Sequence, residues 1–76
     1  MANKLDTEKL NMWKKKLEAL EKEYASIMQK RGEAIAMGDL SENAAFQMLD
    51  EDAATYRVRI DEVKKIIAKL ENEHSK

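Results

Sequence analysis

The sequence contains no cysteine and no proline, and it has few glycines and few aromatic residues. The absence of cysteine excludes disulfide bonds, thiolate metal sites and cysteine nucleophiles. Because only two glycines and no proline interrupt the 76 residues, long helices are favoured. Aromatic residues make up 5% of the chain, which leaves little material for a globular interior. The composition therefore predicts one small helical domain over residues 1–76.

An excess of charge of one sign is also absent, as are long hydrophobic runs. The chain has 14 basic and 15 acidic residues and a formal net charge of -1, so no overall field attracts nucleic acid or an anionic membrane. No stretch approaches the roughly 18 apolar residues of a membrane span, and the N-terminus lacks the apolar segment of a secretory signal. We therefore expect a cytoplasmic protein with no membrane contact.

What the sequence does contain is a heptad pattern of apolar or small residues, spaced by alternating steps of three and four. We call these positions the seam, and only Arg31 and His74 depart from the rule. Such spacing is typical of a left-handed coiled coil. The seam positions are Leu10, Trp13, Leu17, Leu20, Tyr24, Ile27, Arg31 and Ala34 on the first arm, and Phe46, Leu49, Ala53, Tyr56, Ile60, Val63, Ile67, Leu70 and His74 on the second.

The two arms of the seam mirror each other about Leu40. Folding the chain back at this residue places Leu10 opposite Leu70 and Arg31 opposite Leu49, and every seam residue between them also finds a partner. Two helices that do not pack against each other would have no reason to show this mirror symmetry of their seam positions. The sequence therefore predicts an all-α fold, an antiparallel two-helix coiled-coil hairpin.

We expect helices over about residues 7–37 and 42–74, joined by a tip at residues 38–41. Asp6 or Thr7 is the expected N-cap of the first helix, because short polar side chains accept hydrogen bonds from unpaired amides there.

The tip, near Gly38–Glu42, interrupts the pattern with residues suited to a turn. Gly38 follows the first arm, where a left-handed residue is usually glycine. Asp39 or Ser41 can cap the second helix, and Asp39 with Glu42 has the spacing of a capping box. These roles explain both acids without any reaction.

A functional interpretation uses the same two acids. At the end of a rod, the carboxylates of Asp39 and Glu42 cannot form a closed metal site, because two ligands leave a hard cation mostly hydrated. They could complete a Mg²⁺ site inside another protein and orient a water molecule there. The chain thus has no independent active site and no cofactor of its own.

A second, weaker apolar set lies outside the seam. It represents either scattered surface residues or a stripe for self-association or docking on a partner. Its members are Met12, Met28, Ile35, Met37, Met48, Val58 and Ile66.

The stretch "GDLSENAAF" resembles the tip signature of the Gre family of bacterial transcript-cleavage factors, which commonly reads G-D-L-S-E-N-A-x-Y. The predicted hairpin is similar to the N-terminal coiled-coil domain of these factors, and the motif falls at the predicted tip. The matching residues are Gly38, Asp39, Leu40, Ser41, Glu42, Asn43, Ala44 and the aromatic Phe46.

The resemblance implies that the hairpin enters the secondary channel of bacterial RNA polymerase. Asp39 and Glu42 would help to hold a second Mg²⁺, shared only within that complex, and position water for cleavage of backtracked RNA. The remaining tip residues would contact the polymerase or the 3′ end of the nascent RNA, or support the tip geometry: Gly38, Leu40, Ser41, Asn43 and Phe46.

The sequence also departs from the family pattern. Basic residues flank the tip in typical members, whereas Ile35 and Asp50 stand at those positions here, and Phe46 lacks the family's hydroxyl. The acidic run 50–52 makes contact with RNA phosphate less favourable. The family's C-terminal β-rich anchoring module is absent from these 76 residues.

Three hypotheses follow for the function. The chain is a Gre-like elongation factor that stimulates or modulates transcript cleavage, a non-catalytic polymerase binder that competes with full-length Gre factors, or a helical module that forms a homo-oligomer.

Overall fold

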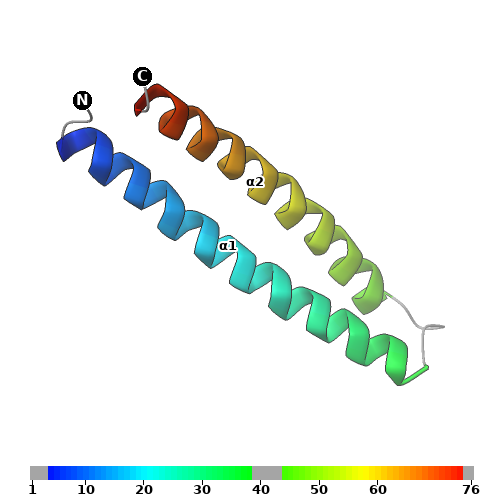
Figure 1. Ribbon diagram of the computed structural model, residues 1–76. Coiled ribbons are helices and arrows are strands. Elements are labelled where there is room, and N and C mark those ends of the chain that lie inside the picture. The colour runs from blue at the N-terminus through cyan, green and yellow to red at the C-terminus, as the bar shows by residue number, and fades with distance from the viewer. Residues whose placement is uncertain (1–3, 39–43, 75–76) are drawn as a thin grey trace.

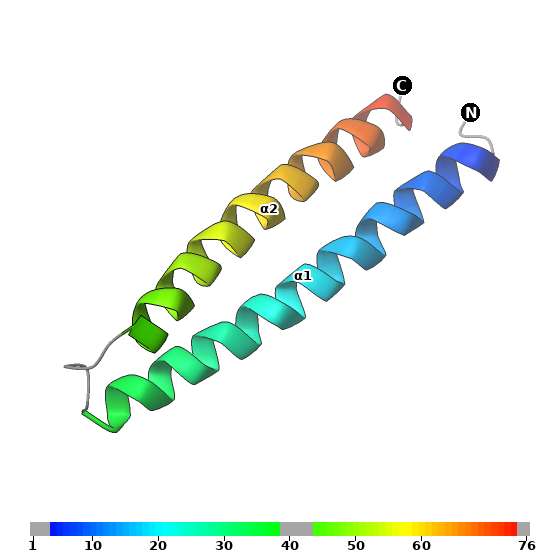
Figure 2. The same cartoon turned by 180° about the vertical axis from the view of Figure 1, so that it is seen from behind.

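The computed structural model describes residues 4–38 and 44–74 of the chain. It contains two helices, α1 (Lys4–Ala36) and α2 (Ala44–His74), which run antiparallel and side by side along their whole length (Figures 1 and 2). The molecule is a rod with extents of 56 × 14 × 14 Å. The predicted all-α hairpin is confirmed.

The seam forms the interface between the helices. Every seam residue from Leu10 to Ala34 on α1, and from Phe46 to Leu70 on α2, is buried or half-buried. Among the other residues whose exposure the structure describes, Asp6 and Ile66 are half-buried and the rest are exposed. Burial therefore follows the heptad period of the sequence, as expected of a coiled coil.

Among the residues whose exposure the structure describes, four hydrophobic side chains form the buried core, with 5 to 9% of their surface exposed: Ile27, Ile60, Val63 and Ile67. Each helix has only one neighbour, so each can bury only one face. Three of the four core residues lie in the half of α2 that ends at His74.

Polar contacts between the helices report their register. Arg31, expected opposite Leu49, forms an ion pair with the adjacent Asp50. Tyr24, expected opposite Tyr56, accepts a hydrogen bond from the next residue, Arg57. These two contacts lie within one residue of the mirror relation, whereas Lys14 pairs with Glu71, five residues from the position expected opposite it.

The start of α1 differs from the prediction. The helix begins at Lys4 rather than near residue 7, so Asp6 lies in the first turn and neither Asp6 nor Thr7 is the N-cap. Lys4 and Leu5 are good helix formers, and no glycine or proline stops the helix before the expected caps. Asp6 still lies favourably against the positive end of the helix dipole.

The other boundaries are close to those expected. Helix α1 ends at Ala36 and α2 ends at His74, whereas the expected start of the second helix at residue 42 lies outside the described residues. Neither described helix has an apolar stretch long enough to cross a membrane.

Candidate functional site

Helix α1 ends in a turn that requires glycine. Gly38 has a φ of 72°, in the left-handed region, and its amide donates to the carbonyl oxygen of Ile35 at 3.0 Å. The Met37 amide donates to the carbonyl oxygen of Glu33, also at 3.0 Å. The Gly38 bond is one of the two that define a Schellman helix end. The prediction of a left-handed glycine at this position is confirmed.

Some of the expected functional residues belong to the described part of the chain, and others do not. Gly38 and Phe46 flank the tip and are described. Asp39 and Glu42 lie outside the described residues, so their expected catalytic and metal-binding roles remain predictions. The expected partner contacts of the residues beside them also remain predictions. The expected site residues outside the described part of the chain are Asp39, Leu40, Ser41, Glu42 and Asn43.

Phe46, close to the start of α2, is a half-buried seam residue. The Arg31 guanidinium lies over its ring, with the guanidinium carbon 5.2 Å from the ring centroid. This distance is typical of a cation–π contact. Of the two roles that the resemblance offered for Phe46, the described contacts support packing at the base of the tip.

Arg31 makes a second contact with α2. Its Nε atom donates a hydrogen bond to Oδ1 of Asp50, and the two side chains retain 34% and 48% of their exposure. Arg31 is the polar residue that interrupts the apolar seam, and Asp50 is the first acid of the run 50–52. The structure adds that the charge of Asp50 is compensated by Arg31 across the interface.

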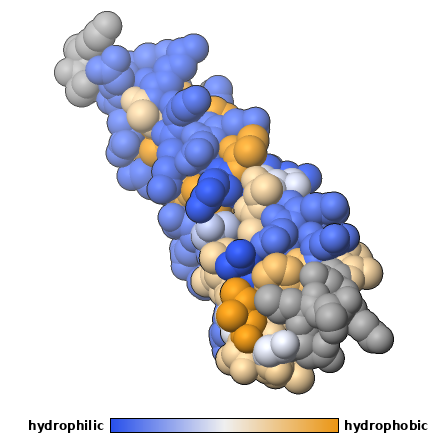
Figure 3. Space-filling view, turned by 90° about the vertical axis from the view of Figure 1, so that its right-hand side faces the viewer, coloured by the Kyte–Doolittle hydropathy of each residue, from blue (hydrophilic) through white to orange (hydrophobic). Residues whose placement is uncertain are grey.

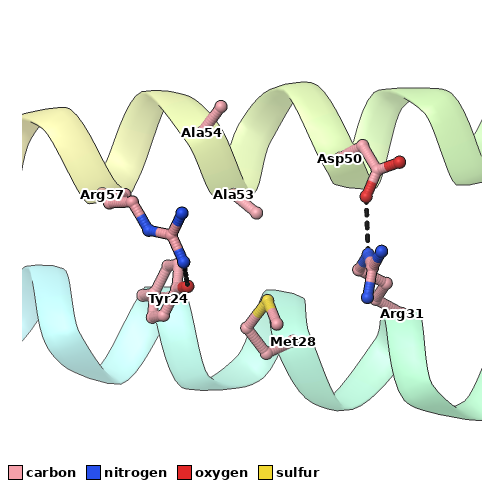
Figure 4. A pocket seen from close by; sticks show the side chains of 7 residues that line it. All are labelled: Tyr24, Met28, Arg31, Asp50, Ala53, Ala54 and Arg57. Carbon is pink, nitrogen blue, oxygen red and sulfur yellow. Dashed lines mark hydrogen bonds and ion pairs between the residues drawn. The ribbon is translucent and has the colours of Figure 1, made fainter.

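A hollow of about 250 Å³ opens beside this pair, between α1 and α2 (Figure 4). Arg31 and Arg57 stand at its two ends, and Arg57 Nη2 donates to the Tyr24 hydroxyl at 3.5 Å. Small side chains on α2 leave the space unfilled. The lining residues are Tyr24, Met28, Arg31, Asp50, Ala53, Ala54 and Arg57.

The hollow does not have the chemistry of an active site. Its lining offers one carboxylate, already paired with Arg31, and no histidine, cysteine or serine. Within residues 4–38 and 44–74, no group of three or more acidic or histidine side chains is arranged to hold a metal ion.

Exposed hydrophobic side chains gather near the tip. Ile35, Met37 and Met48 lie in the last turn of α1, just after it, and in the first turns of α2, with 46%, 80% and 62% of their surface exposed. Figure 3 shows hydrophobic surface around this end of the rod, while the opposite end is mostly hydrophilic. Other members of the second apolar set are also exposed, namely Met12, Met28 and Val58.

The fold defines a class of protein: a slender antiparallel helical hairpin whose first helix ends at a left-handed glycine. The chain matches the family model for the N-terminal domain of transcription elongation factors (GreA_GreB_N) over residues 3–71, and it belongs to this family. No curated protein and no solved structure gives a match. The family relation suggested by the tip sequence is thus established over most of the chain.

Proposed function

We propose that the chain acts on bacterial RNA polymerase in the cytoplasm, by inserting its tip into the secondary channel and stimulating cleavage of backtracked RNA. The observation that carries this proposal is the family match over residues 3–71, which includes the tip motif. The shape supports it, because a rod 14 Å wide and 56 Å long can reach an active site buried within a larger enzyme.

The proposed chemistry assigns the tip carboxylates of Asp39 and Glu42 to a shared Mg²⁺ and to the attacking water. Carboxylate oxygens are ligands that Mg²⁺ prefers. When bound, the ion would lower the pKa of a coordinated water and stabilise charge on the reacting phosphate. Asp50 is already paired with Arg31, so the proposal assigns it no ligand role. The polymerase and water must therefore provide the remaining coordination.

The test separates the charge of Asp39 from its capping role. Asn caps a helix about as well as Asp, so Asp39→Asn should keep the fold but lose the negative charge. We expect stimulated cleavage in stalled, backtracked complexes to fall by at least about 100-fold, with binding to core polymerase retained. Asp52→Asn, which removes an exposed acid from α2, is the matched control and should cleave like the wild type. Equal cleavage by wild type and Asp39→Asn would contradict the catalytic proposal.

A second candidate is a non-catalytic regulator that occupies the channel and competes with full-length Gre factors. It is favoured by exposed Glu51 and Asp52 near the tip, and by Ile35 at a position that is basic in typical members. These residues weaken contact with RNA phosphate. This candidate predicts binding to polymerase and competition with a full-length Gre factor, with equal background cleavage by wild type and Asp39→Asn.

The third candidate, a self-associating module, is favoured by the exposed apolar residues near the tip. It predicts dimers or larger species in sedimentation equilibrium and no binding to core polymerase. A monomer that co-purifies with polymerase would contradict it.

A further inference from the structure

The geometry points to a positioning cluster, formed by Arg31, Asp50 and Phe46, which fixes the register of α1 against α2 at the base of the tip. The role goes beyond holding the helices together, because it sets where the two helix ends lie relative to each other. Its consequence for activity rests on the proposed function, whereas its structural effect can be measured on the protein alone.

One side chain of α1 holds two points of α2. The Arg31 guanidinium lies over the Phe46 ring at 5.2 Å and donates to the carboxylate of Asp50. Phe46 and Asp50 are four residues apart in the sequence of α2, so they lie on one face about one turn apart. A slide of α2 along α1 by one turn would break both contacts. The cluster therefore selects one alignment of the helix ends.

The apolar seam near the tip is poorly suited to this task. Two seam residues in this half are small and only half-buried. They are Ala34, which follows Arg31 on α1, and Ala53, which precedes Tyr56 on α2. Small side chains interlock weakly, and neighbouring exposed hydrophobics such as Ile35 and Met48 could substitute in a shifted seam. A polar residue at a single seam position is a known way to specify register at a cost in stability.

This assignment predicts that a substitution of Arg31 will disturb the register of the helices without lowering the stability of the fold. Arg31 retains only 34% of its side-chain exposure, so its charge is partly desolvated. Arg31→Met leaves Asp50 unpaired, but the cost is small because this carboxylate is 48% exposed and stays in contact with water. A methionine at a half-buried seam position adds apolar burial instead. Arg31→Met should therefore melt at the same temperature as the wild type or higher, while the register near the tip becomes mixed.

The register can be measured with spin labels, because the chain has no native cysteine. Ala36 and Ala45 are exposed at the two helix ends beside the tip, and Ala19 and Ala68 are exposed in the opposite half of the rod. We expect Arg31→Met to broaden the distance distribution of the Ala36→Cys/Ala45→Cys pair and to leave the Ala19→Cys/Ala68→Cys pair unchanged. Asp50→Asn, which keeps Arg31 in place, should broaden the first pair less.

The effect of the cluster on activity is tested by measuring stimulated transcript cleavage with the same variants. Misplacement of reacting groups by about 1 Å costs about 100-fold in rate, so Arg31→Met should lower stimulated cleavage by roughly 10- to 100-fold. The double swap Arg31→Asp/Asp50→Arg should restore much of the activity. Lys14→Met is the matched control, since it removes another cross-helix ion pair far from the tip, and it should leave cleavage unchanged.

The outcomes separate this inference from the proposed function. A narrow, unchanged Ala36/Ala45 distribution in Arg31→Met would overturn the positioning role, and so would a melting temperature clearly below that of the wild type. If the wild type itself stimulates no cleavage, the proposed catalytic function fails, and the distance distributions alone decide on the cluster.

Discussion

The two halves of the rod are built differently. In the half that contains the chain termini, the α2 seam is made of Ile60, Val63 and Ile67, and all three are buried. In the half that ends at the tip, Ile27 is also buried, but the α1 seam then continues with Arg31 and Ala34, which are only half-buried. Three of the four buried residues thus lie in one half, and the polar or small seam residues Arg31, Ala34 and Ala53 lie in the other.

The exposed hydrophobic residues show the opposite distribution. Ile35, Met37 and Met48 are exposed beside the tip. These three side chains lie off the seam, whose residues nearest the tip are Ala34 and Phe46. The difference is consistent with the proposal that the half near the termini provides stability while the tip half meets a partner. Substitutions of the same residue type in the two halves can test this division.

The largest effect is expected from truncating the core of the half near the termini. Ile67 is 7% exposed, and Ile67→Ala removes buried methyl groups and leaves a cavity. We expect a loss of about 3 kcal/mol in the free energy of unfolding, measured by urea denaturation followed by circular dichroism. For a rod with a single buried face this is a large share of the total stability.

The matched control is the same substitution in the tip half. Ile35 is 46% exposed, so Ile35→Ala should change the free energy of unfolding by less than about 0.5 kcal/mol. If both variants lost the same stability, the division between the halves would be wrong.

A smaller effect is expected at the glycine that closes α1. Among the described residues, no atom beyond the chain neighbours lies within 4 Å of a Cβ built at Gly38, so we ascribe the cost of Gly38→Ala to the left-handed φ of 72°. We expect a loss of about 1 kcal/mol. Gly32 lies inside α1 and also has open space around it, so Gly32→Ala should gain about 0.5–1 kcal/mol.

The expected changes in the free energy of unfolding have opposite signs for Gly38→Ala and Gly32→Ala. Together they test whether backbone conformation alone explains the role of each glycine. Thermal or urea denaturation of both proteins under one condition provides the comparison. A stabilising effect of Gly38→Ala would show that the turn at the end of α1 tolerates an ordinary residue. The left-handed φ of Gly38 would then not explain how this helix end is fixed.

The fold could be predicted from the sequence because burial in a two-helix rod is periodic. Each seam residue from Leu10 to Leu70 was identified by spacing alone, and each is at least half-buried. Gly38 could be predicted for a similar reason, since a left-handed helix end favours one residue type. The start of α1 was missed because good helix formers continue the helix past a suitable cap.

The contacts of long polar side chains could not be predicted in the same way. The spacing placed Arg31 on the seam but did not show toward which α2 residues its flexible side chain would turn. The acidic run 50–52 predicts repulsion of phosphate, but the run alone does not show which of its acids pairs with Arg31. The mirror relation contains a signal for this pair, because it places Leu49 opposite Arg31 and so brings the adjacent Asp50 within reach of the arginine.

The smallest effect is expected from the ion pair in the half near the termini. Lys14 Nζ lies 3.4 Å from Glu71 Oε2, and the side chains are 50% and 52% exposed. A double-mutant cycle with Lys14→Gln and Glu71→Gln should give a coupling energy of about 0.5 kcal/mol at low salt, falling toward zero at about 1 M salt. A coupling of about 2 kcal/mol that persists in high salt would mean that this pair specifies the alignment too. The special role of the Arg31 cluster at the tip would then have to be reconsidered, because charge pairs would fix the register at both ends of the rod.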